Sequence, residues 1–265
     1  MDFHEPRILG KTGLRVGRLG VSGGYGAPAE ALEEAFEQGC NYFYHGSFRR
    51  PGMTQAIKNI CGQGKRDRLV VVVQVYNRIA AMTEGSVDRA LRQMNLDYAD
   101  VLLLGWHNST PGGRILEAAR RLQDQEKVTF LAVSGHHRPA FPVMAATGAF
   151  SILHVRYNAA HRGAETEVFP KLPEANRPAL VTYTATRWGQ VLKPKRMPPG
   201  EKTPRASDCY RFVLSNPAVD VCMAGPKNRE EMQEALATLE RGPLSEAEMA
   251  WMRRVGDHVH QRGWF

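Results

Sequence analysis

The stretch Asp97-Tyr-Ala-Asp-Val-Leu-Leu-Leu-Gly-Trp-His107 decides the fold. Its Leu-rich run indicates a buried strand that ends in a polar loop. Similar short runs recur along the chain and alternate with helical patterns, which is typical of βαβ units and a parallel sheet. We expect strands at Leu19–Ser22, Tyr42–His45, Leu69–Val75, Val101–Leu104, Thr129–Ser134, Ile152–Arg156, Leu180–Thr184 and Val219–Met223. Eight strands separated by helices predict an α/β fold, the (β/α)8 TIM barrel.

The helical patterns carry apolar residues at the 3.6-residue period of an amphipathic helix. One helix is expected after Thr83 as N-cap, and another after Asn228, with Glu231 as its capping-box partner. An extra C-terminal helix is expected to begin at Ser245, because Ser-x-x-Glu248 is a second capping box.

Bulk composition indicates one globular domain over residues 1–265, because 43% of the residues are hydrophobic and 23% are charged. No apolar run approaches the length of a membrane span, and the N-terminus has no secretory signal pattern. The four cysteines have no C-x-x-C spacing, and a cytoplasmic protein with reduced thiols is expected. The net charge of +8 favours anionic partners. We expect no nucleic-acid partner, since the basic residues are scattered among acidic ones.

Several segments, in the same order along the chain, resemble the aldo-keto reductase family. They are Arg7–Gly20, Gly39–Phe43, Val133–His136, Tyr157-Asn158, Arg162–Glu165, Leu214–Asp220 and Gly225–Arg229. The resemblance implies that an N-terminal β-hairpin plugs the barrel floor. It also implies hydride transfer between NADPH and the carbonyl of a small-molecule substrate. In that family a tyrosine hydroxyl delivers the proton, and a lysine paired with an aspartate lowers its pKa while a histidine orients the carbonyl.

All four positions of this proton-delivery set carry other residues here. The resemblance places Tyr44 at the aspartate position, Arg49 at the tyrosine position, Gln74 at the lysine position and Gly105 at the histidine position. A shift of one residue brings Phe48 to the tyrosine position, which still supplies no hydroxyl. The resemblance therefore implies the fold and a rebuilt proton donor.

The cofactor half of the resemblance is better preserved. It implies that Ser134 holds the nicotinamide carboxamide and that Tyr183 stacks on the nicotinamide ring. Other positions are expected at the NADP phosphates and the remainder of the cofactor: His154, Thr184, Thr186, Arg187, Gly225, Lys227 and Arg229. Phosphate favours a helix N-terminus with basic side chains, which the segment from Gly225 supplies. Departures from the family pattern are His154 for a glutamine, Gly135 and Ala235 for asparagines, and Glu231 for a neutral or basic residue.

Histidine and tyrosine residues gather at the predicted strand ends. A replacement acid–base set is expected from Tyr44, His45 and His107, with Arg49 as an anion or carbonyl anchor. Tyr44 is the first choice as proton donor, tuned by His45 or His107. The alternative is that these rings fill space and form local hydrogen bonds. A metal site at His45, His107 and His136 lacks carboxylate or spacing support, so no metal is expected.

Three functions remain open from these residues. The first is a divergent NADP(H)-dependent oxidoreductase of the aldo-keto reductase type. The second is a catalytically inactive NADP-binding sensor or partner subunit, which the substituted positions favour. The third is a lyase, isomerase or metal-dependent enzyme that uses the histidines at the barrel mouth. The oligomeric state and the substrate stay open.

Overall fold

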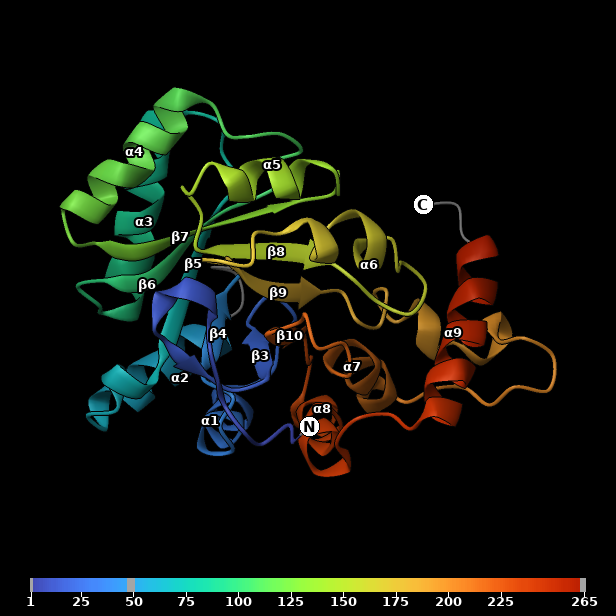
Figure 1. The fold of residues 1–265 in the computed structure, drawn as a ribbon. Helices are drawn as coiled ribbons and strands as arrows, with labels where there is room; N and C mark the ends of the chain where they lie inside the picture. Colours follow the sequence, from blue (N-terminus) through green and yellow to red (C-terminus); the bar gives the residue numbers. More distant parts are fainter. Residues whose placement is uncertain (1, 47–50, 263–265) are drawn as a thin grey trace.

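The computed structural model describes residues 2–46 and 51–262 of the chain. Its central feature is a closed barrel of eight parallel strands in the order β10-β3-β4-β5-β6-β7-β8-β9, with helices around it (Figure 1). The strands are β3 (Leu19–Ser22), β4 (Tyr42–His45), β5 (Val70–Val75), β6 (Ala99–Leu104), β7 (Val128–Gly135), β8 (Ile152–Arg156), β9 (Ala179–Tyr183) and β10 (Val221–Ala224). The predicted (β/α)8 TIM barrel is confirmed.

Successive side chains along each strand point to opposite faces of the sheet. They form one apolar layer inside the barrel and another between the barrel and the helices. On β5, Val70 and Val72 point into the barrel, whereas Val71 and Val73 pack against the surrounding helices. All four are buried, which explains why this run shows no alternation of apolar and polar residues. The hairpin of β1 (Arg7–Ile8) and β2 (Arg15–Val16) closes the floor. Its Leu9 and Val16 are fully buried among the inward residues.

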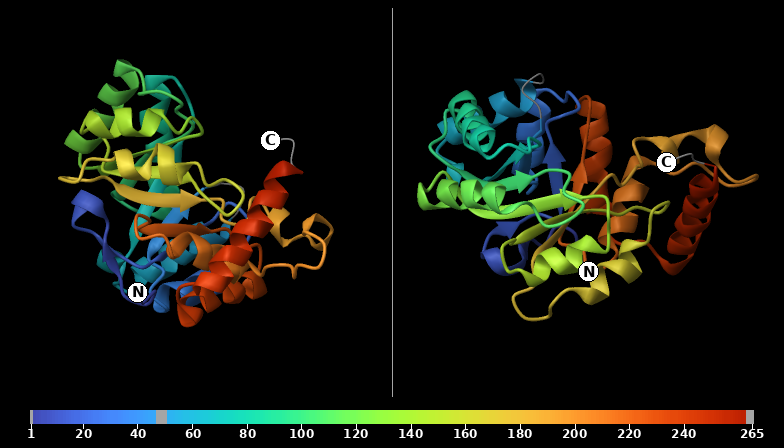
Figure 2. Two further views of the ribbon diagram at one scale, coloured as in Figure 1. Left: turned by 45° about the vertical axis from the view of Figure 1, so that its right-hand side comes forward. Right: turned by 90° about the horizontal axis from the view of Figure 1, so that it is seen from above.

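Nine α-helices are present in the described part of the chain. They are α1 (Ala29–Glu37), α2 (Pro51–Gly62), α3 (Ala80–Met94), α4 (Gly113–Asp124), α5 (Ala140–Ala146), α6 (Ala164–Glu167), α7 (Ala206–Leu214), α8 (Arg229–Arg241) and α9 (Glu246–Gln261). Helix α9 is the predicted C-terminal helix, and its capping box at Ser245 and Glu248 is confirmed. It packs beside the long loop that follows β9 (Figure 2), where Arg254 and Glu201 form an ion pair.

One predicted helix start and one predicted capping-box partner need correction. Thr83 is not an N-cap, because α3 already begins at Ala80. The Thr83 hydroxyl instead donates to the Asn77 side chain and the Ile79 carbonyl from within the first turn. Asn228 does cap α8, accepting from the backbone N–H of Glu231. The Glu231 carboxylate, however, accepts from the N–H of Lys227 rather than closing the box at Asn228.

No helix among residues 2–46 and 51–262 is both long and apolar enough to cross a membrane.

Candidate functional site

A cavity of about 820 Å³ opens where the strands end. Its floor is formed by inward side chains near the carboxyl ends of the strands, including Ser22, Tyr44, Gln74, Leu103, Ser134, His154, Tyr183 and Met223. Its rim carries four large aromatic side chains that are 40–62% exposed, namely Tyr25, Tyr76, Trp106 and Trp188. Barrel enzymes place their active sites at this end, so the cavity is the candidate site.

Strand alternation separates the residues predicted on β4. Tyr44 faces the cavity, and its hydroxyl lies 3.4 Å from that of Tyr76. Burial, with a smaller effect of Tyr76, raises the pKa of Tyr44 well above its ordinary range. His45 is outside the cavity lining, and its Nε2 lies 2.8 Å from Thr54 Oγ1 on α2. Arg49 and Phe48, the candidates for the tyrosine position, lie outside the described residues.

His107 is also held away from the cavity. Its backbone N–H donates to Ser134 O at 2.7 Å, and the Arg78 guanidinium lies 3.2 Å from its Nε2. Burial lowers the pKa of His107 to about 4, helped by the charge on Arg78, and burial also lowers the pKa of His45 to about 4. The structure therefore does not assemble the predicted acid–base set of Tyr44, His45 and His107.

The histidines do not gather around a common point either. Of His45, His107 and His136, only His136 lines the cavity. Among the residues that the structure describes, no group of three or more His, Cys, Asp or Glu is placed to hold a metal ion. The alternative metal site at these three histidines is therefore not brought together.

Sequence reasoning missed Tyr76, which is the nearest polar partner of Tyr44. Tyr76 directly follows β5 and lines the cavity. Its ring packs edge-on against Trp106, with centroids 5.6 Å apart, and Trp106 packs against His136 at 5.9 Å. The one available signal was its place at a predicted strand end, two residues beyond Gln74 on the same face.

The residues predicted to contact the nicotinamide lie together in the cavity wall. Ser134, Tyr183, Thr184 and Thr186 all line the cavity. The Tyr183 hydroxyl donates to Gly135 O at 2.9 Å, which fixes the ring at the cavity wall. Two buried oxygens in the lining have no hydrogen-bond partner, Thr184 Oγ1 and Gln74 Oε1. Unsatisfied buried polar atoms are costly, so a bound molecule with matching groups would stabilise this surface.

His154 closes the cavity floor. It lines the cavity, and its Nε2 lies 2.8 Å from the Tyr42 hydroxyl inside the barrel. Burial lowers the pKa of His154 to about 3, so the imidazole is neutral near pH 7. The neutral His154 ring, held by the Tyr42 hydroxyl, therefore gives the cavity floor a polar but uncharged group in a fixed position.

The phosphate residues predicted by the resemblance are only partly at the cavity. Gly225 and Lys227 line it at the N-terminus of α8. Arg229 instead pairs with Glu34 of α1 at 3.1 Å. Arg187 is buried and donates to the carbonyl of Val259 in α9. These two arginines have structural partners, so their expected role at the phosphates is not supported by their placement.

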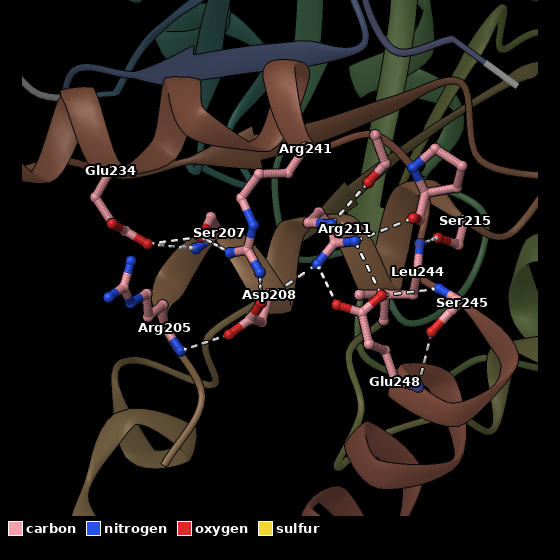
Figure 3. A network of polar contacts seen from close by, with 12 residues as sticks. Arg205, Ser207, Asp208, Arg211, Ser215, Glu234, Arg241, Leu244, Ser245 and Glu248 are labelled. Carbon is pink, nitrogen blue, oxygen red and sulfur yellow. Dashed lines mark hydrogen bonds and ion pairs between the residues drawn. The ribbon is translucent and has the colours of Figure 1, made fainter. Parts of the chain in front are cut away.

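A network of hydrogen bonds and ion pairs joins α7, α8 and α9 and includes the cavity residue Glu234 (Figure 3). Glu234, which lines the cavity, accepts hydrogen bonds from the backbone and hydroxyl of Ser207. Arg241 joins Ser207 to Asp208 at 2.7 Å, and Arg211 continues to Glu248 through two hydrogen bonds. The network ties α7, α8 and α9 together, so this side of the cavity is rigid.

Comparison with known proteins supports the same architecture. No family model matches the chain. Aldo-keto reductase AKR11C1 from Bacillus halodurans is similar in structure in its holo form, with a TM-score of 0.78 and 18% identity over 95% of this chain and 96% of that one. Its apo form has a TM-score of 0.75 and 19% identity, with 95% of each chain covered. At this identity the likeness establishes the fold, an aldo-keto reductase-type barrel.

Proposed function

We propose that this protein is an oxidoreductase that binds a nicotinamide dinucleotide, with NADP(H) as the expected cofactor, and acts on an organic carbonyl or alcohol. The observation that carries the proposal is the cavity itself. On one barrel mouth it combines the expected nicotinamide side chains Ser134 and Tyr183 with the α8 N-terminus at Lys227. The likeness to the barrel of an aldo-keto reductase supports this use of the mouth.

The residues present suit a dinucleotide. The flat ring of Tyr183 offers a stacking surface, and the unpartnered Thr184 Oγ1 offers a hydrogen bond beside it. At the other end of the cavity, Lys227 and the first N–H groups of α8 suit the adenosine 2′-phosphate of NADPH, which NADH lacks. Lys227 also lies 4.0 Å from Glu231, whose charge opposes a second phosphate there. Binding of NADPH is therefore expected to be moderate in strength.

When bound, the reduced cofactor supplies a hydride to the carbonyl carbon. Tyr44 carries its hydroxyl proton near pH 7, as phenols ordinarily do. Burial raises the pKa of Tyr44, so a hydrogen bond to the phenolate is needed for the proton to be released during the reaction. The aromatic rim keeps a substrate ring out of water. Tyr44 is the proposed proton donor.

The test is a titration of the protein with NADPH and NADH, followed by cofactor fluorescence. Lys227→Ala should weaken NADPH binding by roughly tenfold, as expected for one exposed charge-assisted contact, and should leave NADH binding unchanged. Lys58→Ala is the matched control, because Lys58 is an exposed lysine on α2 outside the cavity lining. Absence of binding by both cofactors would contradict the proposal.

Turnover separates an enzyme from a sensor. NADPH consumption with 4-nitrobenzaldehyde as the carbonyl is expected, and Tyr44→Phe should slow it by about 100-fold or more. Binding without turnover over a carbonyl panel would favour the inactive NADP-binding sensor. The substituted Gln74 and Gly105 are the observation that keeps this second function open.

A further inference from the structure

The space beside Gly105 is filled by a neighbouring tyrosine. A methyl group built on Gly105 would lie 2.7 Å from Cδ1 and 2.8 Å from Cε1 of the Tyr76 ring, and it would also collide with Nε2 of Gln74. Any side chain at position 105 would therefore displace Tyr76. The glycine is what allows this ring to lie against the backbone at the end of β6.

The side chain of Arg78 holds the backbone of Tyr76 in place. The Arg78 guanidinium donates to the carbonyls of Tyr76 at 3.1 Å and Gly105 at 2.9 Å, and it also binds the carbonyl of Trp106. One side chain thus joins the loop after β5 to the loop after β6. With Trp106 against the ring, Tyr76 has a defined position although it is 52% exposed.

The hydroxyls of Tyr76 and Tyr44 meet inside the cavity. They are 3.4 Å apart, and both residues line the cavity with Gln74, whose buried Oε1 lacks a partner. Two phenols at this separation can both donate to one acceptor oxygen that lies to one side of the pair, at hydrogen-bond distance from each hydroxyl. Paired hydroxyl donors in a partly buried site are a strong stabiliser of a developing oxyanion.

We propose that Tyr76 and Tyr44 together form a catalytic phenol pair that binds the carbonyl oxygen of the substrate and supplies its proton. This inference rests on the proposed function and deepens it. The rim of Trp106 and His136 beside the pair favours a carbonyl attached to a flat aromatic ring.

Hydride addition and protonation together convert the carbonyl group to an alcohol. The carbonyl carbon gains a hydride from the reduced nicotinamide cofactor, and the electron pair of the C=O π bond moves to oxygen. The O–H bond of one phenol breaks and its proton forms the alcohol O–H. The second phenol donates a hydrogen bond to the phenolate that remains, which then regains a proton from water.

The experiment uses 4-nitrophenol as a probe of the pair, because its phenolate places an oxyanion on an aromatic ring and absorbs visible light. Protein without added cofactor is titrated with the probe across pH. The full-length protein is expected to bind the phenolate more tightly than the neutral phenol. Tyr76→Phe and Tyr44→Phe should each weaken phenolate binding by about tenfold or more, as for a hydrogen bond to a charged group.

Gly105→Ala tests the geometry separately, because its new methyl group must push the Tyr76 ring aside. It should lower phenolate affinity as Tyr76→Phe does. The controls are Tyr98→Phe, at the opposite end of β6, and Gly85→Ala, where a methyl group meets nothing within 4 Å. Both controls should bind the probe as the unchanged protein does, and thermal melts establish that every variant is folded.

Turnover of 4-nitrobenzaldehyde with NADPH completes the test. Tyr76→Phe should lower kcat by about 100-fold. If the unchanged protein fails to prefer the phenolate, or if Tyr76→Phe or Gly105→Ala retains full phenolate affinity, the phenol pair is wrong. If the probe behaves as expected but no cofactor binds, the pair stands as an oxyanion site and the proposed function fails. If turnover occurs and survives Tyr76→Phe, the function stands and the pair fails.

Discussion

Lowering the pH from 7 to 5 should strongly destabilise the fold through four histidines. His45, His107, His154 and His161 are only 4–7% exposed. Burial is the first cause in each case, and it lowers the pKa of His154 to about 3 and those of the other three to about 4. The unfolded chain has a histidine pKa of about 6.5. Since the folded values are depressed, the stability that these groups contribute is full above pH 6.5 and is lost as the pH falls toward 4.

The loss of unfolding free energy follows from the difference in proton binding between the unfolded and folded states. At pH 5 each histidine of the unfolded chain is almost fully protonated, because its pKa is about 6.5. A folded histidine with a pKa of about 4 is still mostly neutral at that pH. Each ring then contributes a loss of about 1.8 kcal/mol, and four rings contribute roughly 7 kcal/mol as an upper figure. This is comparable with the whole stability of a typical domain, about 5–15 kcal/mol.

Urea unfolding followed by tryptophan fluorescence at pH 7, 6 and 5 measures this loss. His154→Gln removes the pH-dependent contribution of His154 alone, because glutamine can still form a hydrogen bond with the Tyr42 hydroxyl and cannot titrate. The fall in unfolding free energy between pH 7 and 5 should shrink by about 1.8 kcal/mol in this variant, while all other groups cancel. An equal fall in both proteins would refute the neutral, buried state of His154. Equal falls in His45→Gln and His107→Gln would restore these two as solvent-reachable acid–base candidates.

Two further predictions concern the cavity wall and the rim. Hydrogen bonds from Arg211 lower the pKa of Glu248 to about 2, so the carboxylate stabilises the fold above about pH 4.5 and that contribution is lost as the pH falls toward 2. Glu248→Gln should lower the unfolding free energy by about 1–2 kcal/mol at pH 7, discounted for a side chain that is 33% exposed, and the difference should shrink by pH 3 in urea titrations. Trp188 has a φ of +50° and is 55% exposed. Trp188→Asn should therefore raise stability by about 0.5–1 kcal/mol in thermal melts, because asparagine tolerates this conformation, and should weaken 4-nitrophenolate binding.

Much of the fold was predictable because buried parallel strands leave short apolar runs in the sequence. Three expected strands, β3, β4 and β8, have the predicted bounds. The last strand was expected from Val219 but begins at Val221. Asp220, just before it, donates its backbone N–H to Leu180 O, and its side chain binds Arg177 and the N–H of Leu180. Thr83 was misplaced as a cap for a similar reason. A local pattern does not show which partner a polar side chain will find.

The site was less predictable because strand ends alone do not show which way a side chain faces. Alternation on β4 puts His45 against α2, although it follows Tyr44 directly. Arg187 and Arg229 were expected at the cofactor, but one donates to a carbonyl near the end of α9 and the other pairs with Glu34. These partners come from elements more than 70 residues away in the chain. Only the folded arrangement brings them together.

Gly105, Gln74 and Tyr76 at the barrel mouth pack against one another and form one arrangement. The absence of a side chain at Gly105 leaves space for the Tyr76 ring, and Nε2 of Gln74 fills the space on the other side of the same glycine. The Tyr44 hydroxyl then has a phenol partner in Tyr76, 3.4 Å away. A lone Tyr76 would clash with a residue at 105, and a lone Gly105 would leave a void. The proposed oxyanion site requires Gly105, Tyr76 and Tyr44 together.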